Sequence, residues 1–163
     1  MTKQTIIFLI ITLLPAFVFS QEITKKDGKY YNTDDELYSG TTQEYYESGG
    51  LKAEIKVEDG VLDGKSIFYF KNGNKKEVHS YKKGKMHGTW ITWNAKKTKV
   101  ALANYKKGEK HGLWKIWDED GTLRFKMRYK NGKKAGTWYN YDEKGELVSK
   151  RNFGKENKDK NKQ

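Results

Sequence analysis

The histidines have side chains suited to binding metal ions or transferring protons, and two of them are regularly spaced. His87 and His111 lie 24 residues apart, and each directly precedes a glycine. In a repeat of β-hairpins, equivalent residues of neighbouring units are separated by two strand spacings, or about 9.6 Å. One zinc ion, with Zn–N bonds of about 2.0–2.1 Å, cannot bridge that gap. We therefore expect these histidines, and the isolated His79, to bind no metal ion and no cofactor.

Carboxylates could perform acid–base chemistry, and four of them fall at expected turns: Asp118, Asp120, Asp142 and Glu143. Turn formation and solubility account for them, since Asp side chains bond to the backbone of tight turns. The sequence has no cysteine, no serine in a G-x-S-x-G context and no phosphate-binding or dinucleotide-binding glycine loop. We expect no enzymatic activity. A hydrolase that gathers carboxylates from neighbouring units is the alternative.

The cationic residues also recur at regular spacing. Five lysines occupy equivalent turn positions of successive units: Lys82, Lys83, Lys106, Lys107 and Lys130. Arg124, Lys126 and Arg128 alternate with apolar residues, so they should extend this charge onto one face of a strand. With a formal net charge of +12, the chain favours anionic partners such as phospholipid head groups, acidic glycans or an acidic protein surface. The alternative is that the lysines keep an aromatic-rich sheet soluble.

The elements that position these residues are copies of one unit. Five glycines are each separated by 24 residues: Gly40, Gly64, Gly88, Gly112 and Gly136. Aromatic residues keep the same step in three columns. One includes Trp90, Trp114 and Trp138, another Trp93, Trp117 and Tyr141, and the third is Tyr81, Tyr105, Tyr129 and Phe153. Self-similarity at such a period indicates a repeat architecture.

Each unit has the pattern of a β-hairpin. In its second half, apolar and charged residues alternate, as from Leu123 to Lys130, which places one set on a buried face and the other in water. In its first half, Trp90 and Trp93 are three residues apart. Either both faces of this strand carry aromatic rings, or a bulge redirects one of them.

The sequence therefore predicts an all-β protein, an array of about five 24-residue β-hairpin repeats that form one extended, twisted antiparallel sheet. The expected segments are a signal peptide at 1–20, an N-terminal cap at 21–39, a repeat domain at 40–153 and a disordered basic tail at 154–163. The units fall near 40–63, 64–87, 88–111, 112–135 and 136–153. We expect Trp90, Trp114 and Trp138 to stack on one another as the core, because a single-layer sheet has few other ways to bury surface. A groove of exposed rings that binds a peptide, lipid or sugar is the alternative.

The first twenty residues predict export. Lys3 provides a positive start, the run from Ile6 to Phe19 is largely apolar, and Ser20 precedes an expected cleavage site. An uncleaved membrane anchor is the alternative, although the run is shorter than the ~20 residues of a relaxed span. We expect a periplasmic or extracellular protein, which disfavours nucleic acid as a partner. Unpaired sheet ends favour a homodimer.

These units resemble MORN repeats of the variant form, with the pattern G-x-W-x-x-Y/W-x-x-x-G followed by an alternating strand and a K-x-G turn. The matching residues include Gly112, Trp114, Trp117 and Gly121, and the resemblance covers about residues 28 to 154. It implies hairpin arrays that bind proteins, dimerise or attach to membranes. It also implies an antitoxin-like role, as described for similar bacterial proteins. We expect an exported scaffold that binds a protein or an envelope component, with attachment to anionic membranes or an antitoxin role as alternatives.

Overall fold

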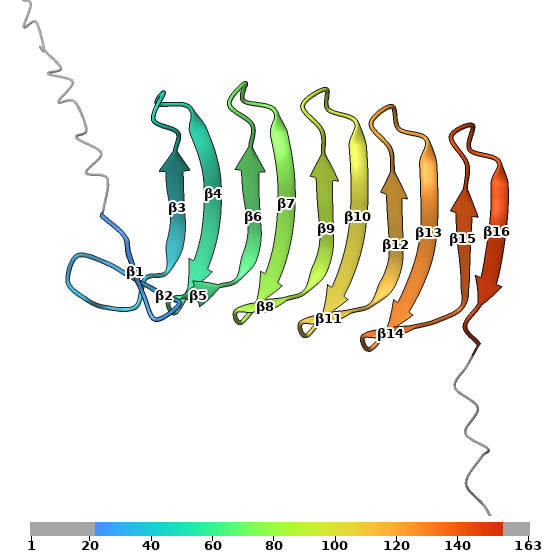
Figure 1. Cartoon of the computed structure of the whole chain (residues 1–163). Helices are drawn as coiled ribbons and strands as arrows, with labels where there is room; N and C mark the ends of the chain where they lie inside the picture. Colours follow the sequence, from blue (N-terminus) through green and yellow to red (C-terminus); the bar gives the residue numbers. More distant parts are fainter. Residues whose placement is uncertain (1–21, 155–163) are drawn as a thin grey trace, which may run out of the picture.

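The alternating apolar and charged residues form five β-hairpins that lie side by side (Figure 1). The computed structural model describes residues 22–154. The predicted signal peptide and residues 155–163 of the predicted tail lie outside this range. The hairpins are β3 (Gly40–Tyr45) with β4 (Leu51–Glu58), β6 (Gly64–Tyr69) with β7 (Lys75–Lys82), β9 (Gly88–Trp93) with β10 (Lys99–Lys106), β12 (Gly112–Trp117) with β13 (Leu123–Lys130), and β15 (Thr137–Tyr141) with β16 (Leu147–Asn152).

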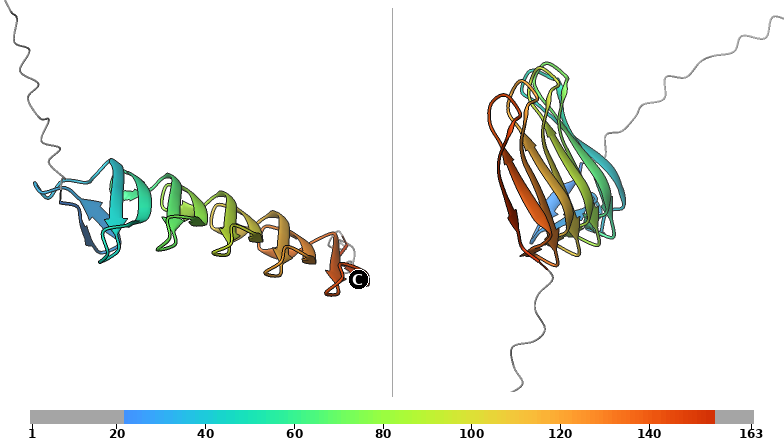
Figure 2. Two further views of the ribbon diagram at one scale, coloured as in Figure 1. Left: turned by 90° about the horizontal axis from the view of Figure 1, so that it is seen from above. Right: turned by 90° about the vertical axis from the view of Figure 1, so that its right-hand side faces the viewer.

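Successive hairpins join edge to edge into one 14-stranded sheet with the order β16-β15-β13-β12-β10-β9-β7-β6-β4-β3. All its pairings are antiparallel, and the array is elongated with curved strands (Figure 2). The predicted all-β, single-sheet fold class is confirmed. Within residues 22–154, no helix is long and apolar enough to cross a membrane.

Each junction between hairpins also contains a two-residue strand that the repeat pattern did not reveal. These strands are β5 (Val61–Leu62), β8 (Lys85–Met86), β11 (Glu109–Lys110) and β14 (Lys133–Lys134). Each pairs with the end of the long strand before it, as Tyr105 does with Lys110. The next turn then bonds back to the short strand, since the Gly108 N–H donates to the Met86 carbonyl over 2.8 Å. Each junction is thereby hydrogen-bonded to the junction before it along the array.

A bulge in the second strand of each hairpin explains the spacing of the two aromatic columns of the first strand, those of Trp90 and Trp93. In β9, Trp90 pairs with Ala103 and Trp93 with Lys99, and the register shifts between Lys99 and Ala101. The extra residue, Val100, therefore lies in β10, while β9 stays regular. Residues three apart on a regular strand point to opposite faces, so both faces of the sheet carry aromatic rings. We call the side of Trp90 the ladder face and the side of Trp93 the second face.

The repeat glycines are required where one hairpin meets the next. Gly88 has a φ of 85°, and a Cβ there would lie 3.4 Å from the Cβ of Ser80 in the preceding hairpin. Gly112 has a φ of 73°, with Asn104 in the equivalent position. A left-handed backbone and a close neighbour together select glycine.

The buried core is aliphatic and lies at the N-terminal end. In β4, Ala53, Ile55 and Val57 are at most 6% exposed, and the alternating charged residues Lys52 and Lys56 are exposed. The predicted alternation therefore holds there. In β13 it holds only in part, because Phe125 is 40% exposed. The cap, a separate hairpin of β1 (Thr24–Lys26) and β2 (Lys29–Tyr31), supplies Tyr30 to this cluster.

Candidate functional site

The first tryptophan column forms part of a continuous row of rings, which we call the aromatic ladder. Its members alternate along the array: Tyr81, Trp90, Tyr105, Trp114, Tyr129, Trp138 and Phe153. Neighbouring ring centroids lie 4.8–5.4 Å apart, mostly with tilted planes. The expectation that the tryptophans stack on one another is therefore wrong. The last three hairpins each contribute a tryptophan from the first strand and a tyrosine or phenylalanine from the second, and the second hairpin contributes Tyr81 alone. A second-strand ring therefore stands between successive tryptophans.

Hydrogen bonds fix each tryptophan of the ladder against the preceding hairpin. The indole Nε1 groups of Trp90, Trp114 and Trp138 donate to the backbone carbonyls of Ser80, Asn104 and Arg128, each over 2.9 Å. Every acceptor directly precedes a ring of the ladder. Buried indole N–H groups need a hydrogen-bond partner. Each tryptophan is therefore positioned by this bond as well as by packing of its ring.

Lysines cover the ladder at its C-terminal end. Lys110 Nζ lies 4.8 Å from the Trp114 ring and 5.1 Å from the Tyr129 ring. Lys134 Nζ lies 4.7 Å from Trp138 and 5.1 Å from Phe153. Both lysines come from the short strands, so these strands also supply cation–π contacts to the rings.

His79 is not isolated, as the sequence suggested, but belongs to the N-terminal end of the ladder. Its ring stacks on Trp90 at 3.9 Å with an interplanar angle of 9°, and its Nε2 lies 2.8 Å from a carboxylate oxygen of Glu77. Burial lowers the pKa of His79, although Glu77 opposes this shift. Glu77 and His79 thus occupy apolar positions of the repeat as a bonded pair.

The other two histidines lie at the junctions between hairpins. The Lys107 N–H approaches His87 Nδ1 to 3.5 Å, which is a long contact for a hydrogen bond. His111 Nδ1 is buried without a hydrogen-bond partner among the described residues. Within residues 22–154, no three His, Asp or Glu side chains are grouped so as to hold a metal ion. The expectation of no cofactor stays a prediction.

The candidate carboxylates bond to the backbone of their own turns. Asp118 Oδ1 and Asp120 Oδ1 each accept the Thr122 N–H over 2.9 Å. Hydrogen bonding with the Asp118 carboxyl, and then with Thr122, lowers the pKa of Asp120. Asp142 Oδ1 accepts two N–H groups in the next hairpin, and Glu143 is exposed beside it. These contacts stabilise turns, and the lack of enzymatic activity remains an expectation.

The five repeated lysines, which we call the lysine edge, follow the lower ends of the hairpins (Figure 1). Lys82, Lys106 and Lys130 end β7, β10 and β13, whereas Lys83 and Lys107 follow in turns with φ of 49° and 55°. All five are exposed. The array therefore presents cations at regular intervals along one side.

Arg124, Lys126 and Arg128 are tied to the neighbouring hairpin instead of forming a free extension of that edge. Arg124 Nε donates to the Tyr141 carbonyl over 3.1 Å, and its guanidinium lies 3.3 Å from Asp118. Lys126 Nζ lies 5.6 Å from the Tyr139 ring. The Arg128 side chain packs beside Gly136. These cations help to join β13 to the last hairpin.

The second aromatic column lies on the second face. Lys115 Nζ lies 5.9 Å from the Trp117 ring, and Tyr141 stacks with Tyr139 at 6.4 Å. Trp93 holds the equivalent position in β9. Both faces of the sheet therefore offer aromatic surface.

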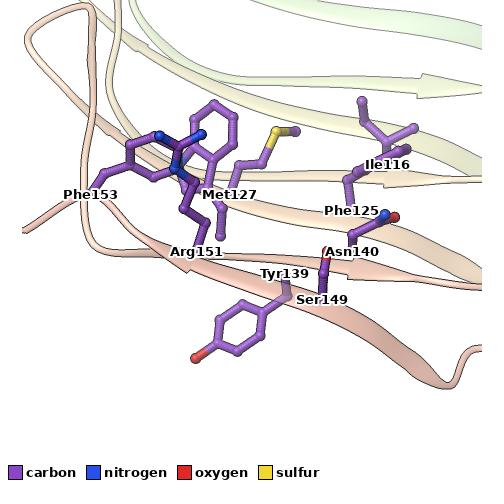
Figure 3. A pocket seen from close by; sticks show the side chains of 9 residues that line it. Ile116, Phe125, Met127, Tyr139, Asn140, Ser149, Arg151 and Phe153 are labelled. Atoms are coloured by element: carbon purple, nitrogen blue, oxygen red, sulfur yellow. The ribbon is translucent and has the colours of Figure 1, made fainter.

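A hollow on the ladder face at the C-terminal end was not predicted from the sequence (Figure 3). It has a volume of about 380 Å³. Its lining residues are Ile116, Phe125, Met127, Trp138, Tyr139, Asn140, Ser149, Arg151 and Phe153. Two of them, Ile116 and Phe125, form a cross-strand pair and are each 40% exposed. The signal available in the sequence was these large apolar residues at positions that are Thr92 and Ala101 one hairpin earlier.

Comparison with known proteins identifies the repeat type. A family model described as MORN repeat variant matches residues 38–59, 62–83 and 110–131. No curated protein sequence matches the chain. A solved structure described as the GtfA/B complex bound to UDP and GlcNAc aligns with 88% of this chain and 26% of its own, at 12% identity and a TM-score of 0.30. The chain thus spans about a quarter of that structure's length.

Proposed function

We propose that this chain, which carries repeats of the MORN variant type, is an exported, non-enzymatic scaffold that binds a protein or an envelope component. MORN repeats are generally involved in binding and scaffolding. The observation that carries the proposal is the exposed apolar pair Ile116 and Phe125 in the hollow. Large apolar side chains grouped and exposed in this way mark interaction sites.

The single-layer sheet supports this role. Few side chains of the sheet are buried, namely Ala53, Ile55, Val57 and Ser66. Within the described part of the chain, no group of His, Asp or Glu side chains is placed so as to hold a metal ion. An array whose units contact only their neighbours offers a long surface to a partner. Export rests on the sequence between Lys3 and Ser20.

Affinity capture from an envelope fraction with tagged protein tests the proposal. We expect a partner that is retained at physiological salt by the unchanged protein and lost with Phe125→Asp, which charges the hollow. Lys96→Gln, at an exposed loop residue, is the matched control and should retain the partner. Equal capture by both variants, or no retained partner, would overturn the proposal.

The lysine edge favours a second candidate function, attachment to an anionic membrane surface. Lys82, Lys106 and Lys130 are exposed at equivalent strand ends, and such a row suits an extended anionic surface. Binding to vesicles containing phosphatidylserine should weaken with salt, because exposed charges are screened over about 8 Å at physiological ionic strength. Replacing the three lysines by glutamine should abolish it. Equal binding to neutral vesicles would eliminate this candidate.

A further inference from the structure

The aromatic ladder stops at Phe153 with one of its contacts unmade. Tyr105 lies between two tryptophans, 5.0 Å from Trp90 and 5.2 Å from Trp114, and Tyr129 is placed in the same way. Within residues 22–154, Phe153 has ring contact with one tryptophan, Trp138, at 4.8 Å. Among the described residues, no ring occupies the position that a further tryptophan would take, and the Arg151 guanidinium lies 5.1 Å from the centroid of the Phe153 ring.

The backbone repeats the same incomplete pattern. The carbonyl that accepts each indole N–H belongs to the residue before a ladder ring, as Arg128 precedes Tyr129. The equivalent residue in the last hairpin is Asn152, before Phe153. At the junction before it, Phe125 and Lys126 pair with Asn140 and Tyr139 of the next strand. Their equivalents in β16 are Ser149 and Lys150, at the edge of the sheet.

We propose that the edge of β16 binds an extended segment of a partner protein, which adds to the sheet as the next antiparallel strand. A tryptophan of that segment packs on Phe153 and donates its indole N–H to the Asn152 carbonyl. The partner's residue two positions later lies beside Ser149, at the rim of the hollow. This proposal rests on the binding function proposed above and names the edge and the chemistry of the partner. Strand addition of this kind supplies affinity through main-chain bonds and specificity through side-chain pockets.

The charge of the edge indicates an acidic segment. Lys150 and Arg151 are exposed on β16. Opposite charges directly across two strands are favourable. A carboxylate on the partner residue opposite Lys150, next to the tryptophan, satisfies this requirement.

The far end of the array does not provide such a segment, which argues against a second copy as the occupant. The β3 position equivalent to the ladder tryptophan is Thr42. The Tyr38 hydroxyl donates to the Thr41 carbonyl over 3.1 Å, and its ring covers Gly40, where a Cβ would meet it at 2.7 Å or less. Pairing two β16 edges would bring Lys150 and Arg151 of both copies together, which like-charge repulsion disfavours.

The chain itself supplies a probe for the experiment. A fluorescent synthetic peptide of the sequence at 135–142, with Tyr139→Glu, carries the tryptophan of β15 and a carboxylate at the position opposite Lys150. Fluorescence anisotropy with the purified protein should show saturable binding. The same peptide with Trp138→Ala should bind at least about fivefold more weakly, since it loses one ring contact and one hydrogen bond.

Protein variants locate the site. Phe153→Ala should weaken binding of the tryptophan peptide to the level of the alanine peptide. Tyr45→Ala, at an exposed ring in the other edge strand, is the matched control and should have no effect. Lys150→Glu with Arg151→Glu keeps the ring of Phe153, so it tests the site even if Phe153→Ala unfolds β16. This double variant should no longer bind the peptide with Tyr139→Glu. It should bind the same peptide with Tyr139→Lys instead.

Equal affinity for the two peptides, or binding that Phe153→Ala leaves unchanged, would overturn the proposal. Loss of binding on mutation of Lys82 and Lys106 alone would also overturn it by placing the site at the lysine edge. If sedimentation shows dimers that Phe153→Ala dissociates, the occupant is a second copy and the partner assignment is wrong. The binding scaffold proposed above would survive each of these outcomes, because its test follows Phe125 and not the β16 edge.

Discussion

The indole Nε1 of Trp114 donates a 2.9 Å hydrogen bond to the carbonyl oxygen of Asn104 in the preceding hairpin. The Trp114 ring also contacts Tyr105 of β10 and Tyr129 of β13, the two strands that flank β12. One side chain therefore joins two repeats by a directional bond and by ring packing. This combination explains why tryptophan recurs at this column, because phenylalanine could supply the packing but not the bond.

Trp114→Phe should lower the free energy of unfolding by about 1–2 kcal/mol, the net value of one hydrogen bond plus a small loss of packing. Urea denaturation gives the value. Trp117→Phe, on the second face, is the control and should cost less. A larger loss of unfolding free energy for Trp117→Phe than for Trp114→Phe would contradict the role assigned to the hydrogen bond between Trp114 and Asn104.

Gly60→Ala should destabilise the protein more than Gly132→Ala. The two residues have nearly equal φ values, 73° and 76°, so both substitutions carry the left-handed strain of about 1–2 kcal/mol. A Cβ on Gly60 would also lie 2.6 Å from the Leu37 side chain and 3.1 Å from the Tyr30 carbonyl, whereas nothing lies within 4 Å at Gly132. Overpacking should add about 1–3 kcal/mol. Equal melting temperatures for the two variants would show that the cap does not pack on Gly60.

Stability should fall as the pH decreases below about 6.5, the usual pKa of histidine. Burial lowers the pKa of His79 in the folded state, so the unfolded chain binds this proton more readily. The stabilisation is present above the unfolded pKa and is lost as the pH falls through the folded one. Urea midpoints between pH 8 and pH 5 measure the effect. His79→Gln should make the urea midpoint depend less on pH in this range. An unchanged pH dependence would mean that other groups cause the loss of stability.

Backbone protection against hydrogen exchange should decrease from β4 towards β16 in the free protein. Ala53, Ile55 and Val57 of β4 are buried, whereas all six residues of β16 are exposed. Local opening is easiest where few apolar contacts hold a strand. Exchange followed by mass spectrometry resolves the hairpins. Uniform protection would mean that the array opens only as a whole.

The repeat spacing was enough to predict the hairpins and their single sheet, because alternation and glycine turns are local properties of the chain. It could not reveal the two-residue strands such as Lys85–Met86, which pair with the last two residues of β7 and are too short to show an alternating pattern. The order of rings in the ladder was also inaccessible. It depends on Tyr105 standing between Trp90 and Trp114, a relationship between strands that each column read alone does not show.

The candidate site was predicted in part. The lysine edge follows directly from the repeat, but Arg124 is engaged with Asp118 and the Tyr141 carbonyl, and no pattern within β13 signals those contacts. The hollow depends on Ile116 and Phe125 meeting across two strands. To predict the hollow, one must know the register between β12 and β13 as well as the residue types.

Hydrogen exchange of the protein with its captured partner tests the central claim, a binding scaffold, most directly. The account predicts new protection in β13, β15 and β16, around the hollow and the open edge, with β3 and β4 unchanged. Protection that is absent, or spread equally over all five hairpins, would contradict it.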